Sequence, residues 1–330
     1  MISSGERPDR APRARSLRSR QPMTSANMTF PPDSAREPEV PRELGKALDE
    51  VCAAAGLDPR GAKLLRFVNN GVFLLRTAPV VVRVVLTSSL AYRADNVVEA
   101  ARWLTERGMP SVRLLPGLRQ PVRAGGYVAT VWEEVPDTGT PPTGYDLGTL
   151  LRSLHALEIP PSVGEWQPVA DARRRLAEGE HELDPRDRDF LKRHCDSVER
   201  RLEELEFALP RGTVHGDAHL GNVIIGPEGP VLCDFDSLCA GPPEWDLTPM
   251  AVGYLRLGRS PEAYRQLVAA YGFDVVAWEG FPVLRDLREL KITVSVLPVL
   301  SSNPSLAGEL RTRLRSMRER DFTVRWTPYR

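Results

Sequence analysis

Lysine is scarce in this chain. Among its 44 basic residues only Lys46, Lys63, Lys192 and Lys291 are lysines, the rest are arginine, and 44 acidic residues balance them. A formal net charge of zero gives no general attraction to nucleic acid or to a membrane surface, so neither partner is expected. No obligatory protein partner is indicated either. With the frequent Ala, Pro and Gly, the preference for arginine is typical of GC-rich coding sequences and predicts a bacterial source.

Cysteine and long apolar runs are also rare. The four cysteines (Cys52, Cys195, Cys233 and Cys239) contain no CxxC pair, which excludes a disulfide scaffold and a structural zinc site of the usual spacing. Buried free thiols are therefore expected. No apolar run approaches the roughly 18 residues of a membrane-spanning helix. These absences predict a cytoplasmic protein with reduced thiols.

Large apolar side chains are sparse in residues 1–40, which are rich in Arg, Ser and Pro. Such a composition cannot bury enough surface to offset the entropy of ordering, so a basic disordered tail is expected. The tail lacks the apolar core of a secretory signal, although its Arg/Ser bias also fits a transit peptide. An overlong start, with initiation at Met23 or Met28, is a further alternative.

Complete glycine-rich nucleotide motifs are missing. The sequence Asn69-Asn70-Gly71 stands where a protein kinase would have G-x-G-x-x-G. Residues 56–63 carry two glycines five apart, but Ala62 separates the second from Lys63, so no Walker A motif exists. Nucleotide binding must therefore be inferred from other residues.

The richest stretch is residues 214–246, VHGDAHLGNVIIGPEGPVLCDFDSLCAGPPEWD. Two apolar runs flank a Gly/Pro turn at residues 226–229, the pattern of a β-hairpin with a longer loop. Such a hairpin places Asn222 beside Asp234, with Asp217 just before them. Because Asp, Asn and Gly are also turn residues, an ordinary loop between core strands is the alternative interpretation.

This arrangement suits phosphoryl transfer. The reaction needs oxygen ligands for a divalent ion that bridges the phosphates, and a carboxylate to orient the attacking hydroxyl. Asp217 followed by Asn222, and then by Asp234 at the end of a hairpin, has the order of the kinase catalytic loop and its metal-binding aspartate.

HGDAHLGN, CDFD and WDLTPM resemble the aminoglycoside phosphotransferase and choline kinase family, whose fold is related to that of protein kinases. The resemblance implies that Asp217 is the catalytic base and that Asn222 and Asp234 hold Mg2+. It implies that His215 and Asp246 support the catalytic loop.

Three further polar residues of this stretch are candidates for contact with a phosphate or with the acceptor. His219 either touches the transferred phosphoryl group or orders the loop. Asp236 and Glu244 would contribute carboxylates to the cleft of a cationic acceptor.

The resemblance implies an α+β, protein-kinase-like fold of two lobes. After the tail (1–40), which composition predicts to be disordered, it places an N-lobe (41–132), a hinge (133–136) and a C-lobe (137–330). Within the N-lobe, apolar spacing predicts a helix over 41–57, a hairpin over 64–75, a strand over 80–86 and a helix over 95–104. In kinases a lysine on the third strand holds the phosphates and pairs with a glutamate on the next helix. Arg83 takes the place of that lysine here, and Glu99 is its predicted partner.

A strand predicted over 128–132 leads into the hinge. The resemblance implies that Trp132, Glu133 and Val135 contact the nucleotide, with backbone groups reading the adenine edge. The C-lobe is predicted to be mainly helical, with helices over 147–157, 171–207, 261–271, 279–298 and 305–320 around the catalytic hairpin. In the first of these, His155 is expected to be a structural core histidine.

The predicted function is transfer of the γ-phosphoryl group of ATP, or of GTP, to a hydroxyl of a small molecule such as an aminoglycoside-type antibiotic, an amino alcohol or a sugar. The first alternative is a non-catalytic pseudokinase that binds a nucleotide or a partner. A metallophosphoesterase is a remote alternative, because residues 216–219 resemble the GDxH of such hydrolases. Those sites need several histidines, and none follows His219.

Overall fold

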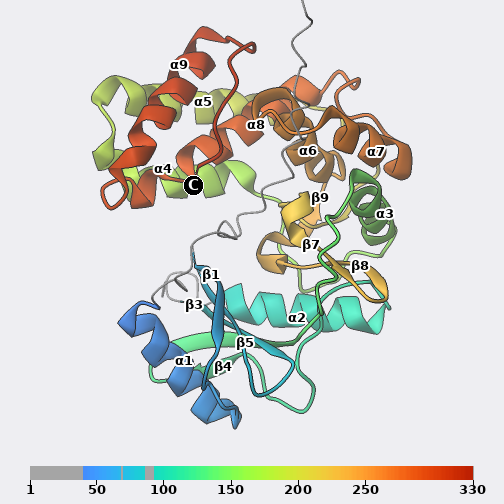
Figure 1. The fold of residues 1–330 in the computed structure, drawn as a ribbon. Coiled ribbons are helices and arrows are strands. Elements are labelled where there is room, and N and C mark those ends of the chain that lie inside the picture. The colour runs from blue at the N-terminus through green and yellow to red at the C-terminus, as the bar shows by residue number, and fades with distance from the viewer. Residues whose placement is uncertain (1–39, 68–69, 86–92, 330) are drawn as a thin grey trace, which may run out of the picture.

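A computed structural model describes residues 40–67, 70–85 and 93–329. The predicted tail, except for its last residue Val40, and the tip of the first hairpin therefore lie outside the described residues. The described chain is α+β, with an antiparallel sheet at one end and a mass of helices at the other (Figure 1).

Five antiparallel strands form the sheet in the order β1-β2-β3-β5-β4. Their bounds are β1 Lys63–Phe67, β2 Asn70–Leu74, β3 Val80–Val85, β4 Val122–Ala124 and β5 Tyr127–Glu133. The hairpin, the strand that follows it and the strand before the hinge are confirmed. The short β4 was not predicted, because three residues are too few to show an alternating pattern.

Two helices cover the sheet. Side chains of β3 and β5 alternate between its faces, so Val82 and Val131 pack with α1 (Arg42–Ala55), whereas Val81 and Trp132 pack with α2 (Arg93–Glu106). Arg83 follows Val82 and therefore lies on the face toward α2.

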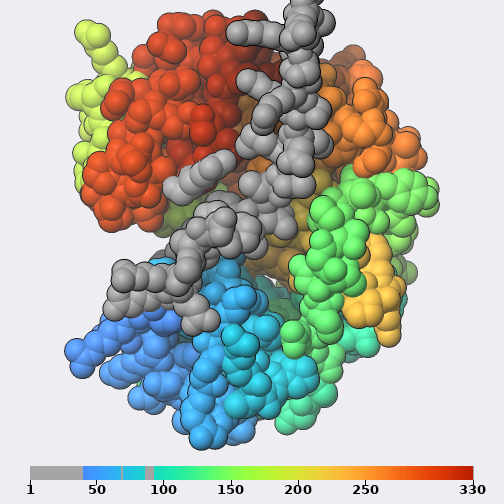
Figure 2. All heavy atoms as spheres, in the orientation of Figure 1, coloured from blue at the N-terminus to red at the C-terminus, as the bar shows by residue number. Residues whose placement is uncertain are grey.

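The remaining helices build the other part of the molecule. They are α3 Gly144–His155, α4 Pro168–Gly179, α5 Pro185–Glu203, α6 Glu244–Arg256, α7 Pro261–Tyr271, α8 Phe281–Val294 and α9 Ala307–Glu319. The predicted limits of α7 are confirmed, with Ser260 capping its first N–H groups and Gly272 ending it in a left-handed conformation. In Figure 2 the segment after β5, drawn in green, runs along the side of the molecule from the sheet to these helices.

Helix α6 was not predicted. Pro249 lies inside it, and eleven of its thirteen residues are buried, so it shows neither the composition nor the one-sided apolar pattern of a surface helix. It packs against α7 and α8.

The predicted catalytic hairpin is present. β7 (Val223–Gly226) pairs with β8 (Gly229–Leu232), with Val223 opposite Leu232. A second short antiparallel pair joins β6 (Gly212–Val214), which precedes the hairpin in the sequence, to β9 (Cys239–Gly241), which follows it.

All four cysteines are free, and Cys52 and Cys195 are fully buried. None of the helices in the described part of the chain is long and apolar enough to cross a membrane.

Candidate active site

Asp246, near the start of α6, holds the loop that follows β6. Its Oδ2 accepts the backbone N–H of His215 at 2.6 Å, and its Oδ1 accepts that of Gly216 at 2.8 Å. The side chain is fully buried. A buried carboxylate that accepts two consecutive backbone N–H groups fixes the local path of the chain. This is the supporting position that the resemblance implies for Asp246.

The backbone at Gly216 admits no side chain. Its φ is +81°, and a Cβ there would lie 2.1 Å from the carbonyl oxygen of Ser237. Trp245 donates its indole N–H to the Gly216 carbonyl at 2.9 Å. The loop can therefore pack directly on the 3₁₀ turn Phe235–Ser237 that follows the hairpin.

His215 joins the loop to the end of β8. Its Nε2 lies 3.0 Å from the carbonyl oxygen of Cys233, and its Nδ1 accepts the N–H of Asp217 at 3.4 Å. Because a carbonyl only accepts, Nε2 carries the hydrogen. Both ring nitrogens are thus used by the backbone, which fits a structural role and leaves His215 unable to bind metal as a metallophosphoesterase would require.

The core histidine His155 completes the support. Its Nε2 lies 3.0 Å from Asp246 Oδ2, and its Nδ1 lies 2.8 Å from the hydroxyl of Tyr271. His155 therefore has the structural role that was expected, because it orients the carboxylate that holds the loop.

Asn222 and Asp234 flank the open end of the hairpin. The N–H of Cys233 donates to the backbone carbonyl of Asn222 at 3.0 Å, which brings the two chain segments together. The Asn222 side chain is 1% exposed, and its amide nitrogen donates to the carbonyl of Asp217 at 2.9 Å. That bond orients the amide and leaves its oxygen for another partner.

Asp234 adopts a left-handed backbone conformation with φ +71°, which is uncommon for a residue other than glycine. Burial raises the pKa of its carboxyl, and the nearby Asp236 adds to this, while Arg83 opposes it. Strained backbone conformations of this kind cluster at functional sites, and a cation bound here would relieve the repulsion between the two neighbouring carboxylates.

These donors fit Mg2+. One amide oxygen and one or two carboxylates are hard ligands, and Mg2+ is usually held by one or two carboxylates together with the phosphates of the substrate. Within residues 40–67, 70–85 and 93–329, no group of three or more His, Cys, Asp and Glu side chains is arranged to hold a metal by itself. The donor set therefore suits an ion that arrives with a nucleotide.

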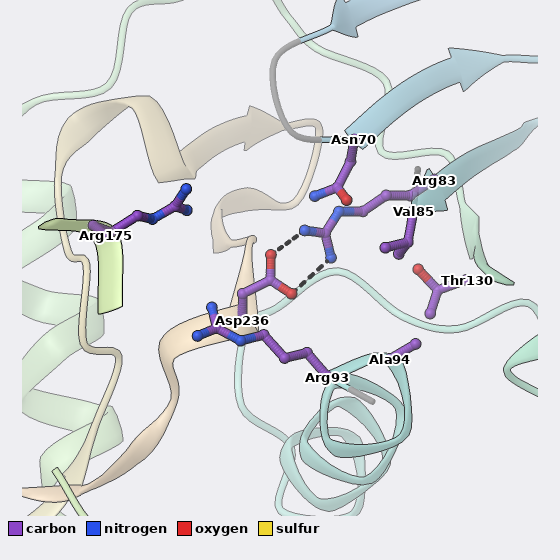
Figure 3. A pocket seen from close by; sticks show the side chains of 8 residues that line it. All are labelled: Asn70, Arg83, Val85, Arg93, Ala94, Thr130, Arg175 and Asp236. Carbon is purple, nitrogen blue, oxygen red and sulfur yellow. Dashed lines mark hydrogen bonds and ion pairs between the residues drawn. The ribbon is translucent and has the colours of Figure 1, made fainter. Parts of the chain in front are cut away.

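Arg83 reaches from β3 to this end of the hairpin. Its Nη1 donates to Asp236 Oδ1 at 3.0 Å, its Nη2 donates to Asp236 Oδ2, and the same Nη2 lies 3.7 Å from Asp234 Oδ1. Burial disfavours the charged guanidinium, but the two carboxylates outweigh it and raise the pKa of Arg83. Figure 3 shows this pair in a pocket that Asn70 and Arg175 also line.

The predicted ion pair between Arg83 and Glu99 is wrong. Glu99 lies on the exposed side of α2, and none of the ion pairs among the described residues involves it. The neighbouring Val98 and Ala100 face inward, so the helix turns Glu99 toward solvent. Asp236 takes the place of Glu99 as the partner of Arg83.

The three nucleotide candidates near the hinge lie at the end of β5. Trp132 is 7% exposed, and its indole N–H donates to Thr130 Oγ1 at 2.8 Å. The backbone N–H of Glu133 donates to the backbone carbonyl of Arg113 at 2.9 Å, and that of the next residue donates to the carbonyl of Pro79. Val135 is half-buried beside Gly226 of the hairpin. Among the three candidates, its N–H is the one left for an adenine edge.

Asp217 has a neighbour that local sequence patterns did not reveal. Arg288, on α8, donates from Nη1 to Asp217 Oδ1 at 2.7 Å, while His219 Nε2 lies 4.0 Å from Oδ2. Burial alone would raise the pKa of the Asp217 carboxyl, but Arg288 foremost, with Lys291 as a further cation, holds it below its ordinary value. Burial lowers the pKa of His219 to about 4 despite the nearby carboxylate.

The model of the phosphotransferase enzyme family matches residues 65–287. The chain belongs to this family. The matched residues include all of the sheet except the first two residues of β1, together with the loop after β6, the hairpin and α6, and they end one residue before Arg288. A search by sequence among curated proteins finds no match.

Solved structures of kinases share the fold of this family member. A choline kinase from Streptococcus pneumoniae is 15% identical, with a TM-score of 0.58 over 80% of this chain and 96% of that one. A spectinomycin phosphotransferase bound to ADP and spectinomycin is 14% identical, with a TM-score of 0.55 over 82% and 93%. An amicoumacin kinase bound to AMP-PNP and Ca2+ is 14% identical, with a TM-score of 0.60 over 82% and 91%. The α+β, protein-kinase-like fold is thereby confirmed.

Glu244 does not line the cleft of this phosphotransferase family member, which corrects the prediction. It is fully buried, and its Oε1 accepts the N–H of Leu209 at 2.7 Å. Because α6 is buried on nearly all sides, its first carboxylate is turned into the protein. Asp236 does lie in the site, but it is bound to Arg83.

The ring contacts of the candidate aromatic side chains form a Tyr254–Tyr264 pair and a chain in which Phe207 joins Trp166 to Trp278. Tyr254 stacks on Tyr264 at 5.9 Å, whereas Trp245 contacts Trp166 at 5.4 Å in the other core cluster. These described rings do not converge into the cage that would bind a quaternary ammonium group.

Proposed function

We propose that the protein is a small-molecule kinase that transfers the γ-phosphoryl group of ATP, or of GTP, to a hydroxyl group. The acceptor oxygen forms a bond to the γ-phosphorus, the bond from that phosphorus to the β–γ bridging oxygen breaks, and the nucleoside diphosphate leaves. Asp217 orients the hydroxyl and takes its proton.

The proposal rests on one observation above all. The Asn222 side chain donates to the carbonyl of Asp217, the N–H of Cys233 holds the residue before Asp234 on Asn222, and Asp246 and His215 hold this loop in place. Asn222 and Asp234 would hold Mg2+, which when bound neutralises charge on the phosphates. Oxygen ligands beside a carboxylate base are the parts that phosphoryl transfer requires.

The nucleotide would lie between an N-lobe (41–132) and a C-lobe (137–330), with the hinge (133–136) at its adenine edge. Arg83 would hold the phosphates, since its planar fork, now on Asp236, matches phosphate oxygens equally well.

Asp217→Asn provides the test. ADP release with Mg2+ and ATP is measured against a panel of alcohols, and nucleotide binding is measured by calorimetry. Loss of a general base costs on the order of 10²–10⁴ in rate, whereas nucleotide affinity should stay within a few-fold. Near-normal turnover by the variant on the same acceptor would refute the role of Asp217.

A non-catalytic nucleotide-binding protein is the second candidate, and the Arg288 contact favours it because that contact occupies the proposed base. Nucleotide binding by the wild type with no acceptor-dependent ADP release across the whole panel would decide for this candidate.

A further inference from the structure

We propose that the acceptor carries an anionic group, a carboxylate or a phosphate, which binds between Arg288 and Lys291 beside Asp217. This inference names the substrate class of the proposed kinase and rests on that proposed function.

Helix α8 brings both cations to the catalytic loop. Arg288 and Lys291 are three residues apart and therefore lie on the same side of the helix. The Arg288 side chain is only 12% exposed and bonds to Asp217 Oδ1 at 2.7 Å. The Lys291 ammonium lies 5.4 Å from the centroid of the Trp245 ring, the same ring whose N–H binds the loop at Gly216.

Only one of these two cations is paired with a carboxylate. Asp217 faces Arg288, whereas among the described residues no carboxylate lies within 4.0 Å of Lys291 and no hydrogen bond reaches its ammonium. Asp171, on α4, is the other acid whose charge reaches Lys291, and it is engaged by Arg174 and Arg93. Apart from the Trp245 ring, the Lys291 ammonium therefore has no direct partner among the described residues, and no carboxylate is paired with it.

Such a charge is costly unless something pairs with it. Lys291 is half-buried, and this burial lowers the pKa of its ammonium despite the nearby charge of Asp217, so its surroundings disfavour the positive charge. Buried charges in proteins are normally paired with an opposite charge or with a ligand. An anion on the acceptor would supply that partner and could use the fork of Arg288 as a second contact.

The opposite charge on the acceptor has no such support. A cationic acceptor would need free carboxylates near Asp217, but Asp236 is bound to Arg83 and Glu244 is buried on the N–H of Leu209. Asp217 itself already faces Arg288. The charges near the proposed base thus favour an anion.

An anion between the two cations would also draw Arg288 away from Asp217. The carboxylate would then be free to accept the hydrogen bond of the acceptor hydroxyl. Binding of the correct acceptor would in this way prepare the base, whereas a neutral alcohol would leave the ion pair in place.

The test uses the full-length protein with Mg2+ and ATP, and acceptors that differ in charge. Glycerate and glycerol phosphate are anionic, glycerol is neutral, and ethanolamine, choline and an aminoglycoside are cationic. ADP release is measured for each. We expect turnover with an anionic member. Lys291→Met should raise KM for it about tenfold or more with a smaller change in kcat, and Lys291→Arg should restore most of the affinity. Lys192→Met, at an exposed lysine paired with Glu180, is the matched control and should behave as the wild type.

Turnover of a cationic or neutral acceptor with unchanged KM in Lys291→Met would overturn the inference and leave the kinase proposal standing. Absence of turnover with every acceptor, although ATP binds, would instead refute the kinase proposal. In that case calorimetry with glycerate and glycerol phosphate tests whether an anion binds between Arg288 and Lys291. Binding that is lost in Lys291→Met supports an anion site, and no binding, or equal binding by the variant, overturns it.

Discussion

The guanidinium of Arg83 holds both carboxylate oxygens of Asp236, across the space between β3 and the turn that follows β8. The pair links the sheet to the catalytic hairpin, and it lies beside Asp234, the proposed metal ligand. A nucleotide that brought phosphates to Arg83 would compete with Asp236 for the same fork. Nucleotide binding is therefore expected to break the ion pair between Arg83 and Asp236.

Arg83→Lys keeps the charge but removes the planar fork. Lysine cannot bind two oxygens side by side, so we expect ATP affinity to fall about tenfold, with little change in thermal stability. Calorimetric titration of ATP in the presence of Mg2+ measures this. Arg60→Lys, at an exposed pair with Asp58, is the control and should leave affinity unchanged. Equal affinity in Arg83→Lys and the wild type would mean that Arg83 serves only to join the sheet to the hairpin.

Asp234→Asn tests the metal. The substitution keeps size and removes the charge that would bind Mg2+. In the wild type, Mg2+ should strengthen ATP binding, and removal of Mg2+ with EDTA should abolish the gain. The variant should lose most of that gain, about tenfold or more, while its affinity for ATP without Mg2+ stays near that of the wild type. An undiminished response to Mg2+ would show that the ion, if bound, is held elsewhere.

Asp246→Asn tests the support of the catalytic loop. An amide offers one acceptor oxygen where the carboxylate now serves His215, Gly216 and His155. A buried polar group left unpaired costs about 1–3 kcal/mol, so we expect a lower melting temperature together with slower turnover. Asp95→Asn, in an exposed pair with Arg123, should change stability by less than about 1 kcal/mol. A melting temperature equal to that of the control would argue against this support.

Features with a local signal were predictable from the sequence. The Gly/Pro turn between two apolar runs specified the catalytic hairpin, and Ser260 and Gly272 marked the ends of α7. The placement of Asn222 beside the segment that leads to Asp234 follows from the register of that hairpin.

Features set by tertiary packing were not predictable in the same way. Arg288 is 71 residues beyond Asp217, and nothing in the sequence of α8 shows which element it will face. The choice of Asp236 over Glu99 as the partner of Arg83 depends on how α2 is rotated, which is decided by its packing and not by its spacing. Helix α6 was hidden because its burial on nearly all sides erases the periodic pattern.

Two cysteines remote from the site test the packing of the two hydrophobic clusters in which they lie. Cys52 in α1 and Cys195 in α5 are fully buried, and burial raises the pKa of each thiol to about 11. At pH 8 their alkylation by iodoacetamide, followed peptide by peptide with mass spectrometry, should be at least about a hundredfold slower than in guanidinium-unfolded protein, because the thiolate is the reacting species. The raised values also predict a pH dependence of stability. Both thiols ionise first in the unfolded chain, so their contribution is complete below pH 9 and is lost as the pH rises toward 11. Rapid labelling of either peptide in the native protein at pH 8 would mean that its core opens locally, contrary to the packing described.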